Sequence, residues 1–150
     1  MVGENFGVFI NAAAAEALTG AELVPVVASS VTKQATTQQI ANLASNPRVT
    51  SIASSSTPTP NCGTTDIYTI TNLAVGATFG APTGLPADGQ ILIFRILDDG
   101  TAQALAWNVA YVAGSSVPLP TTTVISKWLY VGFRYNSAAS AWHLLAVNQF

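Results

Sequence analysis

The chain carries few side chains that could act as an acid, a base or a nucleophile. Its only histidine is His143 and its only cysteine is Cys62. A nucleophilic site needs a general base beside a serine, cysteine or threonine. His143 stands in an apolar run between Trp142 and Leu144, where packing in a strand or an interface is the expected role. One histidine and one cysteine cannot build a zinc site alone, and we expect Cys62 to be a small neutral residue in a loop.

Paired carboxylates offer a second route to chemistry, as in glycoside hydrolysis. Asp98 and Asp99 are adjacent and precede Gly100. In such a turn, aspartates hydrogen-bond the backbone and tolerate unusual dihedral angles. The alternative is a calcium site, which would need several oxygen ligands to converge. Asp66 and Asp88 stand in predicted loops without a motif. We therefore expect no enzyme, no cofactor, and no catalytic, cofactor-binding or metal-binding residues.

The sequence also lacks motifs that bind phosphate groups. It has no P-loop and no strand–GxGxxG–helix pattern, so Gly76, Gly80 and Gly84 are interpreted as loop glycines. The basic residues form no stripe that could neutralise a run of phosphates. They are spread over the chain as Lys33, Arg48, Arg95, Lys127 and Arg134. We expect no nucleic-acid partner.

Three tryptophans, Trp107, Trp128 and Trp142, could bind carbohydrate by their residue type. Tryptophans in strands more often fill a core or an interface. We therefore favour packing, and keep carbohydrate binding as the alternative.

The composition is unusual for a protein that works as a single chain. Charged residues make up 8% of the sequence and the net charge is −2, whereas a soluble domain has about 25% charged residues. A membrane span needs about 20 consecutive apolar residues, and the apolar runs here are short and interrupted by Pro25 or Arg95. No signal peptide and no membrane location are expected. Because little charge repels a second copy, we predict an oligomer whose interfaces hide much of the apolar surface.

Residues 1–47 differ from the rest of the chain. They predict a helix over residues 11–18 and a small hairpin formed by residues 22–27 and 31–33. Thr36 and Gln39 have the spacing of a capping box, so a second short helix follows. This segment is too short to hold its own core. We interpret it as an arm that docks on a neighbouring subunit or on another protein.

Residues 48–150 predict short strands separated by turns, and therefore a mainly β domain built as an antiparallel sandwich or barrel. Two hairpins are expected, one across the turn at residues 98–100 and one across residues 136–140. The predicted strands cover residues 67–73, 91–97, 101–108, 109–112, 117–119, 128–135 and 141–147. Residues 91–97 are apolar on both faces apart from Arg95, and residues 128–133 show the same property. One face should fill the core and the other should meet a neighbouring chain.

Several motifs resemble a module found in virion proteins of tailed bacteriophages. The similar stretches are Asp88-Gly89-Gln90, Arg95-Ile96, Asp98-Asp99-Gly100-Thr101-Ala102, Ala104-Leu105-Ala106-Trp107-Asn108, Leu119-Pro120-Thr121-Thr122-Thr123-Val124, Leu129-Tyr130-Val131-Gly132, Tyr135-Asn136, Trp142 and Ala146-Val147. Together they cover about Thr65–Gln149. Leu97 and Gln103 depart from this pattern, because basic residues are expected there. These departures put any shared surface-binding role in doubt and fit burial in an interface.

A second resemblance concerns the N-terminal segment. Its residues are similar to a short unit of phage fibre and appendage proteins, in the runs Leu18-Thr19-Gly20-Ala21-Glu22-Leu23-Val24-Pro25-Val26-Val27, Val31-Thr32-Lys33-Gln34, Thr36-Thr37 and Ile40-Ala41.

The two resemblances imply a jelly-roll-like β-sandwich (residues 48–150), an N-terminal docking arm (residues 1–47) and assembly as a homotrimer. They imply a structural virion protein, made in the host bacterial cytoplasm, with no catalytic residues. The leading hypothesis is a capsid decoration or cement protein that binds the major capsid protein. The alternative is a tail-fibre, baseplate or head-fibre component that binds a receptor or carbohydrate.

Overall fold

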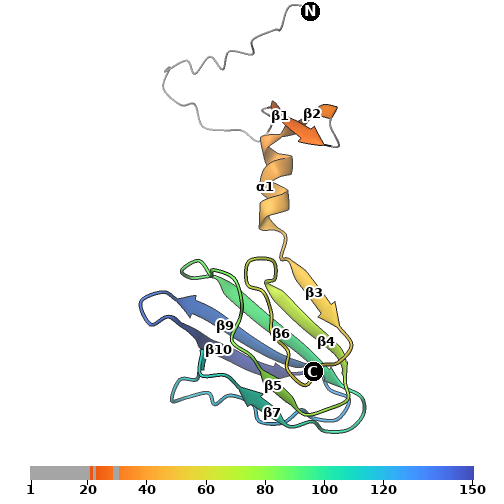
Figure 1. The fold of residues 1–150 in the computed structure, drawn as a ribbon, viewed down its shortest axis with the longest axis vertical. Coiled ribbons are helices and arrows are strands. Elements are labelled where there is room, and N and C mark those ends of the chain that lie inside the picture. Colours follow the sequence, from red (N-terminus) through yellow and green to blue (C-terminus); the bar gives the residue numbers. More distant parts are fainter. Residues whose placement is uncertain (1–20, 22, 29–30) are drawn as a thin grey trace, which may run out of the picture. The chain divides into compact units, whose positions relative to one another are not determined.

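The computed structural model describes residue 21, residues 23–28 and residues 31–150. The chain divides into two compact units, Met1–Asn46 and Pro47–Phe150 (Figure 1). The helix expected over residues 11–18 lies outside the described residues. Within the described residues, no helix is long and apolar enough to span a bilayer.

The first unit contains the predicted small hairpin. Strand β1 (Leu23–Ala28) pairs antiparallel with β2 (Val31–Thr36), so that Leu23 lies opposite Thr36. Pro25 lies in β1 opposite Gln34. A two-stranded ribbon tolerates this proline because each of its strands is an edge, where a missing N–H need not break a ladder.

The capping box predicted at the start of helix α1 (Thr37–Ser45) is confirmed. The backbone N–H of Gln39 donates to Thr36 Oγ1 at 3.1 Å, and the backbone N–H of Thr36 donates to Gln39 Oε1 at 2.8 Å. These bonds satisfy two N–H groups that a helix start would otherwise leave without a partner. The helix ends before Pro47, whose ring disfavours helical geometry at Asn46.

The second unit is built on a six-stranded mixed sheet with the order β3-β4-β6-β9-β10-β8. Its strands are β3 (Val49–Ile52), β4 (Ile67–Leu73), β6 (Ile91–Asp98), β8 (Tyr111–Val112), β9 (Leu129–Asn136) and β10 (Ala141–Gln149). The antiparallel pairs are β6 with β9 and β9 with β10, which is the predicted final hairpin. The pairs β3–β4, β4–β6 and β8–β10 are parallel. The sheet is thus mixed, because the long connections over residues 53–66 and 74–90 carry the chain back to the same end.

The hairpin predicted across residues 98–100 is wrong. After β6 the chain leaves the main sheet, and β7 (Leu105–Trp107) pairs in parallel with β5 (Ala77–Phe79) as a separate two-stranded sheet. The aspartate–glycine turn forms, but burial of Leu105 and partial burial of Trp107 over the main sheet outweigh continued pairing with β6. Residues 117–119 form no strand, so that prediction is also wrong.

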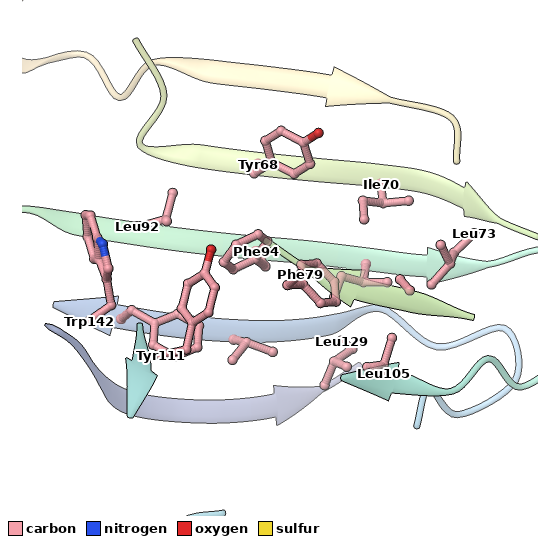
Figure 2. Close-up of a cluster of buried hydrophobic side chains, with 14 of the residues drawn as sticks. Tyr68, Ile70, Leu73, Phe79, Leu92, Phe94, Leu105, Tyr111, Leu129 and Trp142 are labelled. Carbon is pink, nitrogen blue, oxygen red and sulfur yellow. The ribbon is translucent and has the colours of Figure 1, made fainter. Parts of the chain in front are cut away.

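The core lies between the main sheet and the β5–β7 sheet (Figures 1 and 2). Phe94 on β6 is completely buried and is the centre of an aromatic cluster. Its ring centroid lies 5.0 Å from that of Phe79 and 5.4 Å from that of Trp107, which come from the second layer. Figure 2 shows these layers converging on one cluster with Tyr68, Ile70, Leu92 and Leu129.

Burial alternates along the two central strands as the sequence predicts. On β6 and β9 every second side chain enters the core and is fully buried, namely Leu92, Phe94, Ile96, Leu129, Val131 and Phe133. Intervening side chains therefore point to the other side of the sheet.

Candidate functional site

The side of the main sheet opposite the core is the principal candidate surface, and we call it the outer face. Its side chains alternate with the core residues along each strand. The outer face is defined by Val49, Ser51, Ile67, Thr69, Ile91, Ile93, Arg95, Leu97, Tyr130, Gly132, Arg134, Asn136, His143, Ala146 and Asn148.

An apolar row crosses the outer face from one edge strand toward the other. The strand register places Val49 beside Ile67, Ile67 beside Ile93, Ile93 beside Gly132, and Gly132 beside Ala146. Val49 is 54% exposed and Ile91, in the adjacent row, is 50% exposed. The neighbouring row, Ser51–Thr69–Arg95–Tyr130–Asn148, is mostly polar, and the Phe150 ring lies 5.3 Å from that of Tyr130. Exposed apolar side chains grouped in a row are a candidate interaction site.

The charged side chains of the outer face are all cationic. The Arg95 Nε donates to Thr69 Oγ1 at 2.9 Å and covers that threonine, which is buried. Arg134 lies beside Ile91 on β6 and His143 on β10. Within the described part of the chain, the one ion pair joins Arg48 to Asp66, so neither arginine of the outer face has a carboxylate partner.

His143 lies between two open hollows at the β10 side of the outer face. One has a volume of about 330 Å³ and is lined by residues that include Asp88, Arg134 and Asn136. The other has a volume of about 410 Å³ and includes Val112 and Leu144. Neither lining contains a serine, threonine or cysteine, so the histidine has no nucleophile to activate there.

The adjacent carboxylates Asp98 and Asp99 serve the turn, as predicted. Asp98 is 4% exposed, and its Oδ1 accepts from the N–H groups of Gly100 and Ser126 at 3.1 and 2.9 Å. Asp99 Oδ1 accepts from the N–H of Thr101 at 3.1 Å. Burial opposes ionisation of Asp98, but its hydrogen bonds from Ser126 and Gly100 outweigh this and hold its pKa below the usual value. Gly100 has φ of 95°, a conformation that glycine adopts readily.

A polar clamp formed by Arg48 and Asp66 has no signal in the local sequence. The backbone N–H and the Nε of Arg48 donate to Asp66 Oδ2, each at 2.9 Å, and an Arg48 terminal nitrogen donates to Oδ1 at 2.6 Å. The same guanidinium donates to the carbonyls of Cys62 and Gly63. Hydrogen bonding from Arg48 lowers the pKa of Asp66. The clamp fixes the start of β3 beside the start of β4 and is structural.

The remaining candidate residues also have packing or turn positions. The Cys62 thiol is buried and donates to the Thr83 carbonyl at 2.9 Å, and burial raises the pKa of this thiol. Asp88 Oδ1 accepts from the Ser137 N–H at 2.9 Å. Gly76, Gly80 and Gly84 lie outside the helices and strands. Across the described residues, no three His, Cys, Asp or Glu side chains come together that could hold a metal ion.

The three tryptophans have different environments. Trp107 stacks on Phe79 with ring centroids 4.1 Å apart, and its Nε1 donates to the Pro120 carbonyl at 2.8 Å. Trp142 is 3% exposed and contacts Tyr135. Trp128 is half-buried and lies outside the core cluster, where it exchanges backbone hydrogen bonds with Phe150. Trp107 and Trp128 are both half-buried, but Trp107 is packed against the core, so Trp128 is the better candidate for contact with a surface ligand.

No protein-family model, curated protein sequence or solved structure matches this chain. In the chain's own geometry, the apolar row of the outer face is the feature that packing within residues 47–150 does not explain.

Proposed function

We propose that this chain is a non-catalytic structural subunit of a tailed-bacteriophage virion, and that it acts as a homo-oligomer. The observation that carries the proposal is the apolar row Val49–Ile67–Ile93–Gly132–Ala146 on the outer face. Coverage by a neighbouring subunit accounts for an apolar row on the side of the sheet that faces away from the core. The low content of charged residues, 8%, supports the same conclusion.

The placement of the reactive side chains supports a role without catalysis. Asp66 and Asp98 are held by hydrogen bonds that stabilise local structure, and Cys62 is buried beneath a loop. His143 lies on the outer face among side chains that offer it no nucleophile. Asp66, Asp98 and Cys62 thus have structural roles in the fold.

Within this proposal the protein is a capsid decoration or cement protein, a homotrimer that binds the major capsid protein through the N-terminal arm (residues 1–47). The resemblance of Thr65–Gln149 to phage virion modules supports the virion location. The two layers formed by the main sheet and β5–β7 support a jelly-roll-like sandwich. The parallel pairs β3–β4 and β4–β6 speak against a wholly antiparallel version of that fold.

The experiment that tests a decoration role is a copy count on assembled particles, combined with binding to heads that lack the protein. We expect hundreds of copies per particle. We also expect saturable binding that is lost when residues 1–47 are removed. The truncated chain must first be shown to fold by circular dichroism. About a dozen copies would place the protein in an appendage, and full occupancy by a folded truncated chain would contradict arm docking.

The alternative is a tail-fibre, baseplate or head-fibre component with a receptor-binding role. One observation favours it: the hairpin β1–β2 and the capped helix α1 lie in the residues that resemble the fibre-type unit. A glycan array on the intact oligomer separates the two roles. Saccharide binding that Trp128→Ala abolishes would support the appendage role, since Trp107 and Trp142 are packed in or against the core.

A further inference from the structure

A second exposed apolar surface surrounds the turn that follows β6. Val75, Val124 and Ile125 are large exposed aliphatic side chains. Two hydrogen bonds hold their segments at the turn: the Asp99 N–H donates to the Leu73 carbonyl at 3.2 Å, and the Ser126 N–H donates to Asp98 Oδ1 at 2.9 Å. We call Val75, Asp99, Gly100, Val124 and Ile125 the turn patch.

The turn patch and the outer face differ in charge. Among the described aspartates, Asp66 is paired with Arg48 and Asp98 is buried. The pKa of Asp88 is lowered mainly by the hydrogen bond from Ser137 and, to a smaller extent, by the charge of Arg134. Asp99 remains as the exposed aspartate that makes no ion pair in the described residues. It makes only hydrogen bonds to the turn and, at 3.5 Å, to Gln103. Lys127, close in sequence to the patch, makes no ion pair with it.

The strands of the outer face show the converse pattern, since their apolar row is flanked by Arg95 and Arg134, while the carboxylate beside this face, Asp88, comes from a turn near Arg134. Two outer faces that met across a twofold axis would bring cations together in a desolvated contact. Like-charge juxtaposition in an interface is unfavourable. A second copy therefore fits this face better through a different, acidic surface.

We infer that the outer face of one copy binds the turn patch of the next copy, with Asp99 placed against Arg95. This inference rests on the proposed homo-oligomer and names its two contacting surfaces. Both surfaces contain exposed apolar side chains, and their charges are opposite: Asp99 on the turn patch, Arg95 and Arg134 on the outer face. Because the two surfaces are different, the contact is heterologous, and a heterologous contact forms a ring such as a trimer when the rotation between copies closes, rather than a twofold dimer.

The test is a charge exchange between the two surfaces of the full chain. Arg95→Glu places like charges at the contact, and Asp99→Lys does the same from the other side. Each single variant should weaken association at least about tenfold, since close charge pairs in interfaces couple by about 1.5 kcal/mol or more. The double variant Arg95→Glu/Asp99→Lys restores opposite charges at every contact and should recover association to within about threefold of the parent, measured by sedimentation velocity over a concentration series.

Folding is checked separately, because Arg95 also donates to Thr69 inside its own chain. Circular dichroism and thermal unfolding show whether Arg95→Glu is misfolded. If it is, Arg95→Gln replaces it, because glutamine retains a hydrogen-bond donor, and Asp99→Asn replaces Asp99→Lys. Ala106→Glu is the matched control, because it adds a carboxylate at an exposed position on β7 and should leave association unchanged.

Four outcomes would overturn the inference. If Arg95→Glu weakens association but Asp99→Lys does not, another carboxylate contacts Arg95. If both single variants weaken association and the double variant does not recover, the two residues do not meet. If no variant affects an oligomeric parent, the contact lies elsewhere, while the copy count on particles still decides the proposed function. A parent that stays monomeric yet decorates particles would refute this contact and leave a virion role standing.

Discussion

Replacement of Trp107 gives the clearest separation between a core residue and a ligand-binding residue. The indole stacks on Phe79 at 4.1 Å with an interplanar angle of 10°, and it also contacts Phe94 and Tyr111, each with centroids 5.4 Å apart. Its Nε1–H donates to the Pro120 carbonyl. Trp107 thus attaches β7 and the segment at Pro120 to the main sheet, so its loss should destabilise the whole second layer.

The size of the effect follows from these contacts. Truncation of a packed tryptophan to alanine costs about 3–5 kcal/mol, and because Trp107 is partly exposed we expect Trp107→Ala to lower the free energy of unfolding by about 3 kcal/mol. Trp107→Phe keeps a ring on Phe79 but removes the donor to Pro120. That variant should cost about 1–1.5 kcal/mol, the usual contribution of one hydrogen bond.

The assay is equilibrium unfolding in urea, followed by circular dichroism. All variants are compared at one protein concentration, because association adds to apparent stability. Trp128→Ala is the matched control, since Trp128 lies outside the core cluster and should cost less than half as much as Trp107→Ala. If Trp107→Ala stays within about 1 kcal/mol of the parent, the packing argument is wrong. If it also abolishes saccharide binding, Trp107 is a ligand platform.

Three further predictions concern other parts of the chain. Gly132→Lys should weaken association at least about tenfold, because it places a charge in the apolar row. The variant should fold normally, since a Cβ on Gly132 meets nothing closer than the Ala146 carbonyl at 4.0 Å. Sedimentation equilibrium measures the association, and an unchanged value would argue against the outer face as an interface. Asp66 and Asp98 have lowered pKa values in the folded protein. Their contribution to the stability of the fold is therefore present above the unfolded pKa near 4 and is lost as the pH falls below it. The melting temperature should drop from pH 5 to pH 3, and Asp66→Asn should reduce that drop. Thr36→Val removes the side-chain acceptor at the start of α1 and should lower the stability of this helix by about 1 kcal/mol. Amide exchange in residues 37–45 should then be about fivefold faster. An unchanged exchange rate would mean that the capping box does not limit the opening of α1.

The sequence alone predicts those elements whose signals are local. The capping box needs only Thr36 and Gln39. The alternation of β4 is readable only as far as Ile70, because a register shift after that residue exposes Asn72 and buries Leu73, against the predicted alternation. The final hairpin is also local, since β9 and β10 are separated by a short turn. In each case the residues that decide the structure lie within a few positions of one another.

Features that depend on distant residues were not predictable in this way. The Arg48–Asp66 clamp joins residues from two loops, and neither residue has a motif that points to the other. The aspartate–glycine turn at Gly100 predicts a hairpin, but it cannot show that Leu105 and Trp107 bury more apolar surface in the second layer than beside β6. Parallel pairing has no short-range signature either, because it depends on where long connections lead the chain.

The same distant pairings set the order of events during the protein's synthesis. β3 is made early and pairs with β4 only after residues 53–66 emerge. β6 can pair with β4, but its other edge stays open until β9 is made, and β8 pairs with β10 only near the end of the chain. Topologies with such non-local contacts fold on a timescale of milliseconds to seconds, and their apolar strands stay open meanwhile. Because little charge keeps the new chains apart, we expect the yield of folded protein to rise with slow translation, low temperature or chaperones.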